Sequence, residues 1–105
     1  MTDHLTVLTT TDSAERAELL ARAAVEARVA ACAQIDGPIR SVYRWDGAVR
    51  LDEEWRVLYK TTAARYAALE QVVKEHHTYD TPEIIAVDIQ RGSAAYLAWI
   101  DAESG

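Results

Sequence analysis

The feature that most constrains the fold is an Asp46-Gly47 pair between two long runs rich in β-branched and aromatic residues. Asp-Gly in this setting is the strongest short-range signal for a β-hairpin, because both positions tolerate the positive φ angles of a tight turn. The flanking runs cover residues 39–45 and 48–62. We therefore expect a long hairpin in the middle of the chain.

Before the hairpin, the sequence predicts a strand, a helix and an interrupted second strand. Residues 4–10 alternate with period two and are rich in β-branched side chains, which indicates a strand. Asp12 is the expected N-cap of the helix, and Glu15 would complete a capping box. Residues 31–35 are small and apolar and precede Asp36-Gly37-Pro38, which predicts a bend before the chain extends again.

After the hairpin, apolar residues at helical spacing predict a second amphipathic helix over residues 63–77. Pro82 favours an extended chain, so a strand is expected over residues 83–89, and Ser93 is the expected N-cap of a short final helix. The order β-α-β-β-α-β, followed by this helix, predicts an α+β fold, a ferredoxin-like sandwich with two helices on one face of an antiparallel sheet. No linker composition divides the chain, so we expect a single domain over residues 1–105.

The hairpin strands outrun the two helices that could cover them, and they carry the aromatic residues Tyr43, Trp45, Trp55 and Tyr59. Long, exposed apolar strands promote pairing between chains, and a closed ring of identical subunits is a common way to cover them. The pattern therefore predicts self-association.

The net charge and the N-terminal sequence argue against some classes of protein function. The chain has 17 acidic and 11 basic residues, a net charge of −6, which disfavours binding to nucleic acids and to anionic membranes. The N-terminus has no basic segment followed by an apolar run, and Cys32 is the only cysteine. These features predict a soluble, cytoplasmic protein without a disulfide.

Five blocks, in order and spacing, resemble the CutA divalent-cation tolerance family, and together they span most of the chain. They are residues 30–35 (AACAQI), 41–47 (SVYRWDG), 60–62 (KTT), 77–85 (HTYDTPEII) and 96–100 (YLAWI). The resemblance implies a tightly packed homotrimer, similar in shape to the trimeric PII signalling proteins, and a link to tolerance of copper and other divalent cations. The chain departs from the family pattern at Gln34, where Asn is typical, and at Thr78, where Pro is usual. The loss of that proline is expected to loosen the segment after His77.

The resemblance makes Cys32, His77 and Glu83 the candidate metal ligands. A thiolate suits Cu(I) or Zn(II), but a cysteine between alanines on a short apolar strand is more often a small buried hydrophobic residue. His77 lies where a helix ends, and a local electrostatic role there is an equal alternative. Acidic residues 52–54 lack the spacing of a calcium loop, so a solvated strand is the simpler interpretation.

A second candidate site is a polar cleft for a small ligand. Lys60 ends the strand before the second helix and Glu83 starts the strand after it, so both could meet His77 and Tyr79. Acid, base and hydrogen-bonding groups that converge in this way could bind a ligand or catalyse a reaction, but a structural Lys-Glu ion pair is the more common outcome.

The sequence contains no phosphate-binding glycine loop, no nucleophile elbow and no Cys-x-x-Cys pair, so we expect no enzyme and no obligatory cofactor. The leading hypothesis is a homotrimer that binds Cu(II) or another divalent cation in metal homeostasis. The alternative is a PII-like signalling module that binds a small anionic ligand or a partner protein in clefts between subunits.

Overall fold

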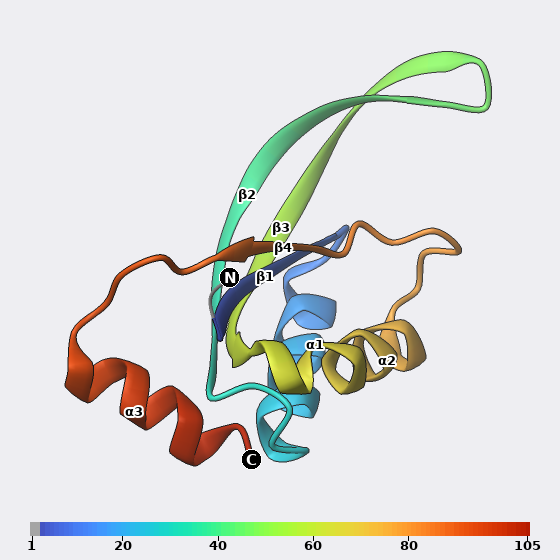
Figure 1. The fold of residues 1–105 in the computed structure, drawn as a ribbon. Helices are drawn as coiled ribbons and strands as arrows, with labels where there is room; N and C mark the ends of the chain where they lie inside the picture. The colour runs from blue at the N-terminus through green and yellow to red at the C-terminus, as the bar shows by residue number, and fades with distance from the viewer. Residues whose placement is uncertain (1–2) are drawn as a thin grey trace.

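The computed structural model describes residues 3–105, and it has the predicted β-α-β-β-α-β order with a further helix at the C-terminal end (Figure 1). The first two residues, which entered the prediction of cellular location, lie outside the described part. In chain order the elements are β1 (His4–Thr11), α1 (Ala14–Glu26), β2 (Cys32–Trp45), β3 (Ala48–Thr62), a 3₁₀ turn η1 (Ala63–Arg65), α2 (Tyr66–His76), β4 (Ile85–Asp88) and α3 (Ala94–Glu103). The strands form one antiparallel sheet in the order β2-β3-β1-β4.

Helices α1 and α2 pack on the same face of this sheet, as the sequence predicted (Figure 1). Side chains alternate between the two faces of a strand, so Val7 on β1 and Val57 and Tyr59 on β3 point towards the helices, and all three are fully buried. Leu20 of α1 and Leu69 of α2 complete the same core cluster. The Tyr59 hydroxyl donates a hydrogen bond to the Leu20 carbonyl oxygen at 3.1 Å, which satisfies its polar group inside the core.

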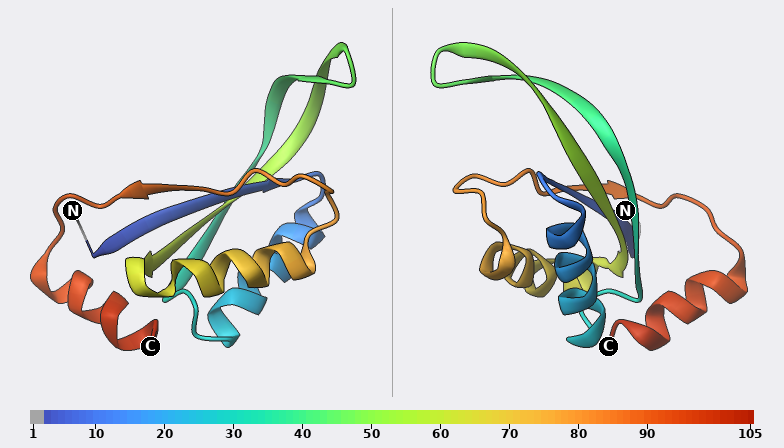
Figure 2. Two further views of the ribbon diagram at one scale, coloured as in Figure 1. Left: turned by 45° about the vertical axis from the view of Figure 1, so that its right-hand side comes forward. Right: turned by 180° about the vertical axis from the view of Figure 1, so that it is seen from behind.

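The hairpin of β2 and β3 extends well beyond the helices (Figure 2). Asp46 and Gly47 have φ angles of 50° and 76°, the pair of positive values that a type I′ turn requires, and Trp45 pairs with Ala48 across the turn. The ladder is irregular at Asp36-Gly37-Pro38, where the sequence predicted an interruption, although the chain stays extended and β2 is one strand from Cys32 to Trp45. A β-bulge between Asp36 and Ile39, where the Gly37-Pro38 peptide bond is cis, takes the place of the bend.

The structure corrects the predicted start of α1. The N-cap is Ser13, whose side chain accepts a hydrogen bond from the Arg16 amide at 3.0 Å, whereas Asp12 lies between β1 and the cap. The third helical position is therefore Arg16, and the expected capping box with Glu15 does not form. Ser93 caps α3 as predicted, accepting a hydrogen bond from the Tyr96 amide.

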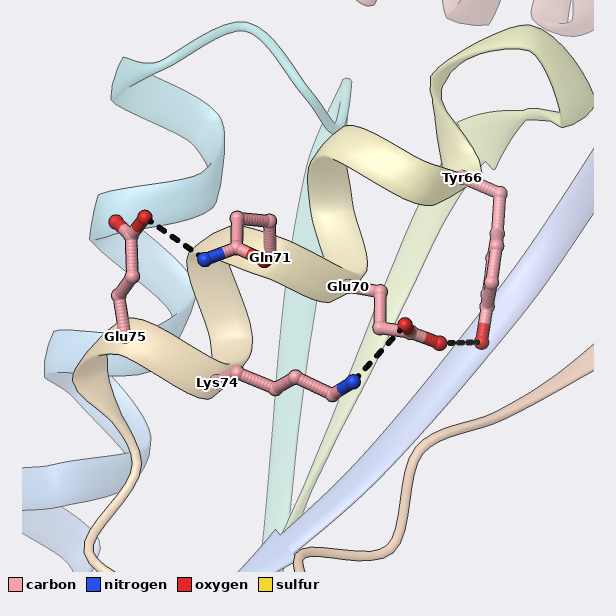
Figure 3. Close-up of polar contacts among 5 residues, drawn as sticks. All are labelled: Tyr66, Glu70, Gln71, Lys74 and Glu75. Carbon is pink, nitrogen blue, oxygen red and sulfur yellow. Dashed lines mark hydrogen bonds and ion pairs between the residues drawn. The ribbon is translucent and has the colours of Figure 1, made fainter.

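The second helix and the last strand are both shorter than predicted. The helical segment begins with the 3₁₀ turn η1, and α2 ends at His76, so that His77 is already extended. On the solvent side of α2, Glu70 accepts hydrogen bonds from Tyr66 at 2.9 Å and Lys74 at 3.2 Å, both four residues away (Figure 3). Figure 3 also shows Gln71 bonded to Glu75, and such i,i+4 pairs stabilise a helix modestly.

The sheet face opposite α1 and α2 exposes aliphatic side chains. Leu8 of β1 pairs with Leu58 and Ile85, and Val87 lies two residues further along β4 on the same face. Ile85 and Val87 are 51% and 60% exposed. Helix α3 begins to one side of the sheet, and its C-terminal end lies next to the end of α1 (Figure 1), where Arg28 donates a hydrogen bond to the Ala102 carbonyl oxygen at 2.8 Å. Of the helices described, none combines the length and apolar composition that a membrane span needs.

Candidate functional site

A cleft of about 640 Å³ lies where the hairpin leaves the body of the protein, next to the segment that joins α2 to β4. This volume is within the range of small-molecule sites. Three aromatic rings and three carboxylates dominate its lining, and they are Tyr43, Trp45, Tyr79, Glu54, Asp80 and Glu83. Tyr79 and Glu83 are two of the residues predicted from the sequence.

His77 positions Tyr79 at the edge of this cleft. Its Nδ1 lies 3.0 Å from the backbone nitrogen of Tyr79, and its Nε2 lies 2.8 Å from the carbonyl oxygen of Thr10. An amide can only donate and a carbonyl can only accept, so Nδ1 is the acceptor and Nε2 carries the proton. The two rings are also in contact, tilted by 46° with centroids 4.8 Å apart. His77 thus joins β1 to the segment after α2.

These contacts require the neutral imidazole. Burial lowers the pKa of His77 below its usual value, although the Thr10 carbonyl and the charge of Asp12 act in the opposite direction. The single lone pair of this tautomer is held by the Tyr79 amide. A metal ion can reach Nδ1 only by displacing that amide, so His77 as placed here is a positioning residue and not an open ligand.

Two tyrosines of the cleft donate hydrogen bonds to carboxylates. The Tyr79 hydroxyl donates to Glu54 Oε2 at 2.8 Å, and the Tyr43 hydroxyl donates to Asp52. Burial raises the pKa of Tyr79, and the bond to Glu54 raises it further, whereas for Tyr43 the bond to Asp52 is the main cause of a raised pKa. Both tyrosines therefore stay protonated and hold these carboxylates against the aromatic rings.

The cleft is acidic, since no Lys, Arg or His side chain is among its lining residues. Within residues 3–105, the carboxylates of Asp80 and Glu83 have no hydrogen bond or ion pair. The charge of Glu83 acts on Arg56, but the Arg56 guanidinium is already bound by two hydrogen bonds of 2.8 Å to Asp36. The fixed charges of this cleft therefore favour cations.

Lys60 and Cys32 do not belong to this cleft. Lys60 pairs with Thr6 of β1, whereas the cleft is lined by Thr10. Thr6 and Thr10 are four residues apart on the strand, and the rise of a β-strand separates them by about 13 Å. The Lys60 ammonium donates to Gln34 at 2.8 Å, so the predicted meeting of Lys60 with Tyr79 and Glu83 is wrong within one chain.

Cys32 pairs with Lys60 across the β2-β3 ladder and is half-buried, rather than fully buried as its alanine neighbours suggested. Its sulfur lies 3.6 Å from the hydroxyl of Tyr96 on α3. The chain therefore does not bring Cys32, His77 and Glu83 together, and across residues 3–105 no three His, Cys, Asp or Glu side chains converge as a metal site would require. The residues of one chain do not fit a preformed copper centre.

Sequence reasoning missed Glu54, Asp80 and the cleft role of Tyr43. Glu54 was interpreted as part of a solvated acidic strand. The period of two offered a signal, because it places Asp52 and Glu54 of β3 on the same face of the hairpin as Ser41 and Tyr43 of β2.

Known proteins agree with the fold and the sequence pattern. The family described as CutA1 divalent ion tolerance protein matches residues 5–103. The divalent-cation tolerance protein CutA of Thermus thermophilus is 42% identical over 94% of this chain and 96% of its own.

Solved structures are equally similar. The crystal structure of CutA from Xylella fastidiosa is 33% identical and superposes with a TM-score of 0.96, covering 99% of this chain and 100% of its own. CutA of Archaeoglobus fulgidus, described as periplasmic, has a TM-score of 0.93 at 35% identity, covering 97% of this chain and 99% of its own.

Proposed function

We propose that this chain, which belongs to the CutA divalent-cation tolerance family, acts as a homotrimer that binds Cu(II) or another divalent cation in metal homeostasis. The observation that supports cation binding most directly is the acidic cleft, where Asp80 and Glu83 form no ion pair within residues 3–105 and no basic side chain lies in the lining. We also propose a binding rather than a catalytic role, and a cytoplasmic location.

The exposed apolar surface supports self-association. The uncovered sheet face and the hairpin expose aliphatic and aromatic side chains, and Val42, Val49 and Leu51 are each more than half exposed on the hairpin. Large exposed apolar areas of this kind mark interaction surfaces, and long exposed strands are rarely left open to solvent. Three copies are the number that the family resemblance implies.

The donors in the cleft are carboxylate and phenol oxygens, which favour hard or borderline cations over Cu(I). Because one chain offers too few converging donors, we propose that a second subunit or water molecules complete the coordination. Cys32 lies too far away to share this ion within the same chain, so the proposal rests on Glu83 rather than on the thiol.

The anion-binding alternative has less support from the geometry. An anionic ligand needs basic groups, and the predicted anchor Lys60 is bound to Gln34 outside the cleft. Arg56 is likewise occupied by Asp36.

Calorimetric titration with Cu(II), in a buffer that contains a weak competing chelator, tests the metal proposal. We expect saturable binding that is lost in Glu83→Gln and retained in Cys32→Ala. Glu53→Gln is the matched control, because it removes an identical charge from the neighbouring hairpin surface outside the cleft. Binding that is weak, unsaturable and equal in all four proteins would refute a specific metal site. Sedimentation equilibrium tests the assembly, with three times the chain mass of 11.7 kDa expected.

A further inference from the structure

The same cleft has features that a metal ion does not need. Its volume of about 640 Å³ far exceeds that of one ion, and its walls include the rings of Tyr43, Trp45 and Tyr79. Within a single chain, Trp45 is 52% exposed and Tyr43 40%. Aromatic faces attract cations through their quadrupole, and tryptophan does so most strongly.

The carboxylates are arranged around these rings. Glu54 is held by Tyr79 through one oxygen, which leaves Oε1 without a hydrogen-bond partner among residues 3–105. Asp80 and Glu83 line the cleft from the segment after α2, as does Tyr79. A ligand in the cleft would thus meet aromatic rings and carboxylates from both the hairpin and the segment after α2.

We propose that this cleft binds a small organic cation, with a guanidinium or primary ammonium head that hydrogen-bonds Glu54 and Glu83 and an apolar body that packs on Trp45. The guanidinium is the better match, because its planar donors pair with carboxylates in two parallel bonds and its flat face stacks on aromatic rings. The inference does not depend on metal binding, although both ligands would use Glu83.

The test is a titration of the purified protein with agmatine, a guanidinium probe, in the presence of EDTA so that metal cannot contribute. Butylurea is the matched neutral probe, because a urea has nearly the shape of a guanidinium without its charge. We expect agmatine to saturate a single site per chain and butylurea to bind at least tenfold more weakly. Equal binding of the two probes, or no saturation with agmatine up to 10 mM (about the limit of a specific small-ligand site), would overturn the proposal.

Substitutions and NMR spectra test whether agmatine binds in this cleft. Glu83→Gln should weaken agmatine binding about tenfold and Trp45→Leu about threefold to tenfold. The controls Glu53→Gln and Trp99→Leu, which change exposed residues outside the cleft, should have no effect. In the unmodified protein, the indole N–H resonance of Trp45 should shift on titration while that of Trp99 stays in place. Equal effects of Glu83→Gln and Glu53→Gln, or a shift confined to Trp99, would refute the location.

Experiments can refute the metal-binding proposal and the organic-cation proposal independently of each other. If Cu(II) binding does not saturate but agmatine binds, the metal-binding proposal is refuted and the organic-cation proposal stands. Metal binding without agmatine binding in EDTA would do the reverse.

Discussion

Replacing His77 with alanine should destabilise the folded chain even though this residue contacts no ligand. The substitution removes the hydrogen bond to the Thr10 carbonyl and the one from the Tyr79 amide. Each contributes about 1 kcal/mol net, and a buried carbonyl left without a donor costs about 1–3 kcal/mol unless water replaces it. Thr10 is only 7% exposed, so we expect the free energy of unfolding to fall by about 2–3 kcal/mol.

The cost should depend on pH, because the contacts of His77 need the neutral ring. Burial lowers the pKa of this imidazole in the folded chain, so between the two pKa values the unfolded chain binds more protons than the folded one. The stability that His77 supplies is therefore complete above its unfolded pKa, about 6.5, and is lost as the pH falls through the lower folded value. The difference between wild type and His77→Ala should be larger at pH 7.5 than at pH 5.

Urea unfolding at equal protein concentration measures both effects, since the stability of an assembled protein depends on subunit concentration. His76→Ala is the matched control. Among residues 3–105 its ring bonds only the Val72 carbonyl, one turn earlier in α2, so we expect a cost below about 1 kcal/mol. A cost for His77→Ala no greater than that of His76→Ala, or a cost that rises on acidification, would refute the neutral bridging role.

Three further substitutions test other parts of the fold by the same assay. Ser13→Ala should lower the free energy of unfolding by about 1 kcal/mol, because it removes the N-cap of α1, whereas Asp12→Ala should cost clearly less. A larger cost for Asp12→Ala would show that Asp12 is the cap, as the sequence predicted. Gly37→Ala should cost more than about 1 kcal/mol, because Gly37 has a φ of 146° and a Cβ there would lie 2.6 Å from the Trp55 ring, so a neutral effect would contradict this packing. Tyr59→Phe should cost about 1 kcal/mol by removing a buried hydrogen bond to α1, and no loss would show that the bond contributes nothing net.

The hairpin was predictable because its signal is local. A type I′ turn needs positive φ at its two central residues only, and Asp46 and Gly47 supply both without help from the rest of the chain. The N-cap of α1 was not predictable in this way. Asp12 and Ser13 are adjacent and both suit a cap, and the choice depends on β1 pairing with β3 as far as Thr11 and Trp55, a contact between distant parts of the chain.

In the candidate site, too, some residues could be placed from local sequence and others could not. His77, Tyr79 and Glu83 are neighbours in sequence, so their proximity required only that the segment after α2 stay compact. Glu54 precedes Tyr79 by 25 residues, and its place in the cleft follows from the length and bulge of the hairpin, which the alternation of residues does not encode. Alternation gives the face of a strand but not the position along it, and for this reason Lys60 was wrongly assigned to the cleft.

The separation of Cys32 from the cleft restricts how metal binding can relate to assembly. Cys32 lies level with Thr6 and the cleft with Thr10, so a single ion cannot bind both Cys32 and Glu83 of one subunit. A site that uses both would bridge subunits, and its apparent affinity would rise with protein concentration by mass action. A site within the cleft of one subunit would show the same Kd at every concentration. Titrations with Cu(II) at two protein concentrations that span the dissociation of the assembly therefore distinguish the two arrangements, and we expect the Kd to stay constant if water molecules, and not a second subunit, complete the coordination around Glu83.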